Sequence, residues 1–301
     1  MITTHTSKHL TWVDIENPTG DDIAELVKKF AIHPAWAQEL TRPTERARTE
    51  THDHAFYAAL HYPDHPSRMQ ESRDIEIDFI VGTDFIITSR FQPIDTILDF
   101  SKQFSVAEKL DHGDFKTGSD IFLAINNRLY QGLREELELL RKEIKKIEAE
   151  IFQGNEFGMV HAISHLHRRI LDFKQSLRSH KVILNSFEIQ ADKLFGKHKP
   201  DADAIYREYF RVENALENNR ELIRELRETN DSLLTAKNNE VTKKLTLMAF
   251  VTFPLTLVAT VLAAHNSPAI FQGHNGFWLI IGILVVLFIL MQIYFVYKKW
   301  I

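Results

Sequence analysis

The chain has 301 residues, with 36 Lys and Arg against 41 Asp and Glu, a formal net charge of −5 and no cysteine. The lack of cysteine excludes a disulfide scaffold, thiolate catalysis, cysteine-type zinc sites and iron–sulfur clusters, and the acidic balance argues against a nucleic-acid partner. The charge is uneven, because the segment from Leu245 to Ile301 contains no Asp, Glu or Arg and only two lysines. Removing these two positive charges leaves −7 on residues 1–244. A charged body is therefore joined to an almost uncharged tail, which excludes a purely soluble enzyme.

Residues 1–118 have the pattern of an α/β domain. Short apolar runs predict strands at Leu10–Ile15, Ala55–His61, Asp74–Val81 and Asp84–Ser89, with a hairpin at Gly82-Thr83 between the last two. Thr19 can cap a helix whose apolar residues recur at helical spacing as far as Phe30. Charged and apolar residues alternate along Asp74–Val81, which predicts that one face of that strand is buried.

Residues 119–200 predict an antiparallel helical pair. Apolar residues recur every three or four positions over 119–153 and again from Gly158 to Leu194, with a break at Gly154-Asn155. His161 and His165 lie four residues apart in the second helix, which is the spacing of two metal ligands on one helical face. A solvated helix face is the alternative interpretation of this pair.

Residues 201–264 predict one very long helix, because no Gly or Pro occurs before Pro254. About 64 residues at 1.5 Å each would make it roughly 95 Å long. A heptad-like apolar stripe that includes Asn219 and Asn230 runs along its first half. Polar residues in such a seam often fix register or oligomeric state, so we expect this helix to pack around a symmetry axis.

Two apolar runs, Leu245–Ala264 and Phe277–Tyr297, are each long enough to cross a bilayer. Lysines precede the first run and follow the second, so the positive-inside rule places both chain ends in the cytoplasm and the loop of residues 265–276 outside. The start of the chain lacks the pattern of a signal peptide. We therefore expect a cytosolic body anchored by a C-terminal helical hairpin, with residues 277–301 forming the second membrane helix and a basic C-terminus.

One face of the first membrane helix carries all of its threonines. At 100° per residue the threonines fall within an arc of about 120°. The predicted face consists of Asn239, Thr242, Leu245, Thr246, Ala249, Thr252, Phe253, Thr256, Thr260 and Ala263. Such a face could form a helix–helix contact or line a pore, and its continuation from the polar seam of the long helix favours a pore. Leu245 and Phe253 would then be apolar constrictions that gate by dewetting.

Several motifs resemble the CorA family of divalent-cation channels. The run Asn238–Ala259 contains Asn239, then Leu245-Thr246 after two lysines, then Pro254-Leu255-Thr256, and the chain ends Tyr297-Lys298-Lys299-Trp300-Ile301. Thr11–Ile15 followed by Asn17-Pro18-Thr19 resembles the family's N-terminal part. The resemblance implies a homopentameric funnel with a cytosolic α/β domain, a stalk helix that continues into the pore, and conduction of Mg2+, Co2+ or Ni2+. It also implies that Glu228 and Asp231 could form acidic rings at the cytosolic end of the pore, although a salt-bridged helix surface is the simpler alternative.

The family's Gly-Met-Asn signature at the outer end of the pore helix is missing here. Counting from Pro254, the equivalent positions are Ala263-Ala264-His265, or Ala264-His265-Asn266 with one inserted residue. The outer loop also lacks any acidic residue, whereas hard dications are drawn by oxygen ligands and negative charge. Its histidines could favour a softer metal such as Zn2+.

The sequence thus predicts an α/β cytosolic domain, a long stalk helix and two C-terminal transmembrane helices in a CorA-like funnel. We expect a multi-pass homopentamer of the bacterial inner membrane that transports Mg2+, with Zn2+, Co2+ or Ni2+ as alternative ions. Its expected partners are the lipid bilayer and metal ions, and no resident cofactor is expected. Enzyme motifs such as a phosphate-binding loop or a nucleophile elbow do not occur. The alternatives are a non-conducting scaffold or sensor and an anion-conducting or non-selective pore.

Overall fold

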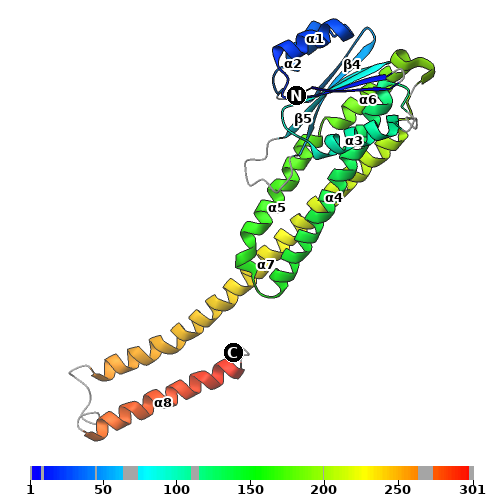
Figure 1. Cartoon of the computed structure of the whole chain (residues 1–301). Coiled ribbons are helices and arrows are strands. Elements are labelled where there is room, and N and C mark those ends of the chain that lie inside the picture. The colour runs from blue at the N-terminus through cyan, green and yellow to red at the C-terminus, as the bar shows by residue number, and fades with distance from the viewer. Residues whose placement is uncertain are drawn as a thin grey trace. The chain divides into compact units, whose positions relative to one another are not determined.

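The computed structural model describes residues 2–7, 10–44, 46–63, 74–109, 115–198, 200–263 and 274–297 (Figure 1). It divides into two compact units, Met1–Glu228 and Thr229–Ile301. The first unit holds the whole α/β part and most of the helices. The second holds the apolar end of the longest helix and the helix that follows it.

The first unit contains a six-stranded mixed sheet. Its strands are β1 Ile2–Ser7, β2 Leu10–Glu16, β3 Arg48–His52, β4 Ala55–Tyr62, β5 Ile75–Gly82 and β6 Phe85–Arg90. They lie in the order β1-β2-β6-β5-β4-β3, with β2 and β6 parallel and every other pair antiparallel. The four predicted strands and the β5–β6 hairpin are confirmed. The sequence did not reveal β1 and β3, which are the two edge strands and are polar in sequence, as edges that face water usually are.

Helices cover both faces of the sheet. On one face, α1 (Gly20–Phe30) and α2 (Pro34–Glu39) pack with Trp36 and Tyr57 in the core. On α1, the predicted cap is confirmed, because Thr19 and Asp22 exchange side-chain and backbone hydrogen bonds. Against the other face, Phe122 and Phe187 contact Phe56 of β4.

Glu76 and Asp78 show that the prediction of one buried face on β5 was incomplete. Both carboxylates lie in the core, and Asp78 is only 1% exposed. They are buried because α2 and the segment between α2 and β3 cover the face that the alternation marked as polar. The Thr44 amide of that segment donates to Glu76, and the Tyr57 hydroxyl of the neighbouring strand β4 donates to Asp78. The pattern of charge along one strand cannot reveal a covering segment more distant in the sequence.

The helical pair predicted for residues 119–200 consists of three helices, α4 Gly118–Phe152, α5 Glu156–Leu177 and α6 His180–Phe195. A further helix, α3 Asp95–Lys109, was not predicted. The expected second helix breaks at Arg178-Ser179 because His180 is fixed in the core. Its Nδ1 accepts a hydrogen bond from the Tyr130 hydroxyl at 2.8 Å, and its Nε2 donates to the carbonyl of His61 at 2.7 Å. Burial lowers the pKa of His180 to about 4, so the ring is neutral as these bonds require.

The longest helix, α7, runs from Asp203 to Ala263 and confirms the single helix predicted there. Its apolar seam does not face a symmetry axis in the first unit, because Val212, Leu216 and Ile223 are buried within this chain. The Asn219 side chain donates to the Leu137 carbonyl of α4 at 2.7 Å. The expectation that these seam residues pack around a symmetry axis is therefore wrong.

In the second unit, α7 contains the segment, among the described residues, that is long and apolar enough to cross a membrane. The last helix, α8, runs from His274 to Tyr297. Its apolar stretch Ile281–Phe295 is shorter than the usual length of a span.

Candidate functional site

The threonine face of α7 is uncovered in the second unit. Thr246, Thr252, Thr256 and Thr260 are all exposed, as are the two predicted constrictions, Leu245 at 61% and Phe253 at 74%. The side of the helix roughly opposite carries the partly covered aliphatic residues, which are Leu247, Val251, Leu255 and Val258. An apolar hollow lined by Phe250 of α7 and by Leu287, Met291 and Tyr294 of α8 shows that α8 lies alongside. The threonine face is thus available to a partner or to water.

Each of these threonine hydroxyls donates its hydrogen to the backbone carbonyl one turn earlier. The Oγ1–O distances are 2.8 Å for Thr246, Thr252 and Thr256 and 2.7 Å for Thr260. Because a hydroxyl has one hydrogen and two lone pairs, the side that remains free is an acceptor. The face therefore presents a column of uncharged oxygen lone pairs. That suits a hydrated cation, whereas an anion would have to break a threonine–carbonyl bond to obtain a donor.

The same pattern continues toward the charged part of α7. The Thr235 hydroxyl donates to the carbonyl of Asp231 at 2.8 Å. Asp231, Ser232, Thr235, Ala236 and Asn239 line a shallow hollow on the helix surface. The exposed residues of this stretch are thus polar oxygens and amides, with the Asp231 carboxylate among them.

The two residues predicted as acidic rings differ in their surroundings. Glu228 is the last residue of the first unit, and its carboxylate is 3.1 Å from the guanidinium of Arg224. Asp231 lies in the second unit and is exposed. Glu228 therefore fits the salt-bridged helix surface that was the alternative interpretation, while Asp231 keeps its place on the candidate face.

Three of the predicted entrance residues, Ala264, His265 and Asn266, lie outside the described residues. Ala263 is the last residue of α7, and nothing is described of its side chain. His161 and His165 are both exposed on α5, in the first unit. Within the described ranges, no group of three or more His, Cys, Asp and Glu could hold a metal ion.

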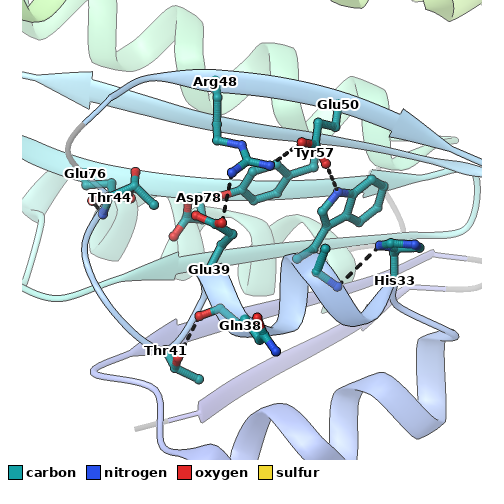
Figure 2. A network of polar contacts seen from close by, with 12 residues as sticks. His33, Gln38, Glu39, Thr41, Thr44, Arg48, Glu50, Tyr57, Glu76 and Asp78 are labelled. Carbon is teal, nitrogen blue, oxygen red and sulfur yellow. Dashed lines mark hydrogen bonds and ion pairs between the residues drawn. The ribbon is translucent and has the colours of Figure 1, made fainter.

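A second polar cluster lies in the α/β part and was not found from the sequence (Figure 2). The indole of Trp36 donates to Glu50 at 2.9 Å, and Arg48 bridges Glu50 and Glu39. Next to them the Tyr57 hydroxyl donates to Asp78 at 2.8 Å, while Glu76 accepts from the Thr44 amide at 2.7 Å. Its members come from α2, β3, β4 and β5, so no local motif could have revealed it.

Burial decides the protonation of this cluster. It raises the pKa of Asp78, with a further contribution from the nearby Glu76 carboxylate, and it also raises the pKa of Glu76. The hydrogen bond from Trp36 instead lowers the pKa of the more exposed Glu50. Among the described residues no donor reaches Oδ2 of Asp78. The cluster ties α2 and the following segment to the sheet.

Comparison with known proteins extends over almost the whole chain. A family model described as CorA-like Mg2+ transporter protein matches residues 7–299. The cobalt/magnesium transport protein CorA of Thermotoga maritima is 20% identical over 300 residues, which cover 96% of this chain and 83% of that protein. The cobalt/magnesium transport protein CorA of Methanocaldococcus jannaschii is 21% identical over 296 residues, covering 97% and 92%.

The fold agrees with these sequence relationships. The complete structure of the CorA magnesium transporter from Methanocaldococcus jannaschii aligns with a TM-score of 0.80 and 18% identity, covering 97% of this chain and 92% of that one. At this identity the likeness shows the fold. It supports the predicted arrangement of an N-terminal α/β domain followed by a long helix.

Proposed function

This chain belongs to the family of CorA-like Mg2+ transporter proteins, and we propose on that premise that it forms a homopentameric channel for divalent metal cations. In this proposal α7 lines an axial pore in the bacterial inner membrane. The second membrane span is α8, and both chain ends are cytoplasmic. The α/β domain and stalk form a cytosolic funnel.

The single observation that carries the proposal is the direction of the threonine hydroxyls. Their hydrogens are committed to α7 carbonyls, so these four threonines offer only oxygen acceptors on the uncovered face. Placed around an axis, five such columns would surround a hydrated cation with lone pairs and would leave an anion without donors. This argues against the anion-conducting alternative. Because the apolar seam of α7 is buried in the first unit, the pore proposal rests on these hydroxyls and not on that seam.

We further propose that the entrance differs from the family's usual one. The sequence Gly-Met-Asn does not occur in this chain, and residues 265–276 contain no acidic side chain. In its place Ala264, His265 and Asn266 would meet the incoming ion. Imidazole suits Zn2+, Co2+ and Ni2+ better than Mg2+, so we expect these ions to be admitted alongside Mg2+. Asp231 would supply the negative charge at the cytosolic end.

A second candidate function is a non-conducting scaffold or sensor, which the missing Gly-Met-Asn sequence favours. Ion flux into proteoliposomes that hold the full chain separates the two, with Mg2+, Co2+, Ni2+, Zn2+ and Cl− tested in turn. Divalent-cation flux without Cl− flux is the expected result. Flux of Cl− would refute the oxygen-column argument, and the absence of any flux would refute transport.

Thr256→Val tests the face directly, because valine has the same shape without the oxygen. Five lost contacts of about 0.5 kcal/mol each would lower the flux by tenfold or more. Thr256→Ser keeps the hydroxyl and is the matched control, with flux close to that of the wild type. Equal flux in both variants would mean that this face does not line the ion path.

A further inference from the structure

His161 and His165 form a pair on the outer face of α5 that the proposed channel does not use. They lie four residues apart in an uninterrupted helix, Glu156–Leu177, and both side chains are exposed. Residues at this spacing have Cβ atoms about 5–6 Å apart on one face of a helix. The two imidazoles can therefore point to a common ion by choice of side-chain rotamer, without a change in the backbone.

The backbone between them is firmly held. Ile163, Leu166 and Ile170 occupy the opposite side of α5 and are buried. One turn further along, Arg169 pairs with Glu143 of α4 at 2.7 Å. Because the core fixes the helix, the backbone needs little ordering when an ion binds. The main entropy cost of binding is that of fixing the two histidine side chains in one rotamer each.

Neither imidazole is engaged by another of the described residues. Within the described part of the chain, no hydrogen bond, ion pair or ring contact involves His161 or His165, in contrast to His180, whose two nitrogens are both bonded. The two arginines that follow on α5 are countered, because Arg169 pairs with Glu143 and Arg168 interacts with Asp172. Binding an ion here would break no existing contact and would meet limited repulsion.

We propose that His161 and His165 chelate one transition-metal dication, of the class Ni2+, Co2+, Cu2+ or Zn2+. Imidazole nitrogen suits these ions, whereas Mg2+ and Ca2+ prefer oxygen ligands. No third His, Cys, Asp or Glu joins the pair in the described residues, so water completes the coordination shell. The site therefore distinguishes transition metals from Mg2+ on a part of the protein separate from the α7 face. It does not depend on the proposed transport activity.

Equilibrium dialysis of the full chain in detergent against Ni2+ tests the site, with bound metal counted per chain in the presence of excess Mg2+. We expect His161→Ala and His165→Ala each to bind one Ni2+ fewer than the wild type, through a loss of affinity on the order of tenfold or more. Far-ultraviolet circular dichroism checks the fold, which exposed helical substitutions of this kind leave intact.

Two further variants separate a chelating pair from incidental histidine binding. His167→Ala removes a third imidazole from the same helix, two residues beyond His165 and on a different side, and we expect it to bind Ni2+ like the wild type. Ser164→His combined with His165→Ala restores a pair at the i, i+3 spacing, and we expect it to recover the lost ion. Equal Ni2+ binding by the wild type and the two single His→Ala variants would overturn the proposal. An equal loss in His167→Ala, or displacement of the ion by Mg2+, would also overturn it.

Discussion

Lowering the pH should loosen α6 through protonation of His180. The ring is fully buried, and its pKa is about 4, compared with about 6.5 for an exposed histidine. Because the folded state holds the neutral ring, the stability that depends on it is complete above pH 6.5 and is lost as the pH falls toward 4. The gap between the two values corresponds to roughly 3 kcal/mol of unfolding free energy, of which about 2 kcal/mol is lost by pH 5.

Protonation acts here through geometry as well as burial. The Nδ1 atom of His180 accepts from the Tyr130 hydroxyl, and a protonated ring has no lone pair for that bond. The Nε2 bond to the His61 carbonyl would survive. We therefore expect the start of α6 to separate from α4 before it separates from β4.

Hydrogen exchange measured by mass spectrometry on the full chain in detergent reports this opening locally. After correction for intrinsic rates, the protection of peptides from α6 should fall about 30-fold between pH 7 and pH 5. His180→Gln is the control, because its amide can replace both hydrogen bonds without titrating. If α6 in His180→Gln loses protection over the same pH range, another group titrates there and the reasoning is refuted.

Four further substitutions test the packing by chemical unfolding of the full chain. Gly118→Ala would place its Cβ 2.2 Å from a backbone oxygen of β6, so it should lower the free energy of unfolding by about 2–4 kcal/mol. Gly132→Ala, whose Cβ would have nothing within 4 Å, should raise it by about 0.5–1 kcal/mol. An equal effect of the two substitutions would contradict the close approach at Gly118. Asp78→Asn keeps an acceptor for Tyr57 and removes a buried acid whose pKa is raised. It should therefore stabilise the folded protein by about 1 kcal/mol or more at pH 8 and hardly at pH 4. A reversed pH dependence would contradict this reasoning. Asn219→Ala removes the bond to α4 and should cost about 1–2 kcal/mol, and no loss would mean that the seam is not anchored there.

Features that depend on neighbours in the sequence could be read from the sequence. The Thr19–Asp22 cap of α1, the β5–β6 hairpin and the unbroken course of α7 all follow from residues within a few positions of each other. The apolar end of α7 and its threonine face are equally local, because helical periodicity alone places side chains on a face. Even the hydroxyl bonds to the preceding turn need only the helix itself.

Other features were decided by contacts between residues far apart in the chain. The break between α5 and α6 depends on His180 meeting the carbonyl of His61, 119 residues away. The buried Asp78 accepts from Tyr57 of β4, 21 residues away, and the apolar seam of α7 is buried within this chain, where Asn219 bonds to the Leu137 carbonyl of α4. Sequence periodicity can show that a face will be buried, since that follows from its side chains. What buries it depends on which distant segment fits and satisfies its polar groups, and only the tertiary structure supplies that.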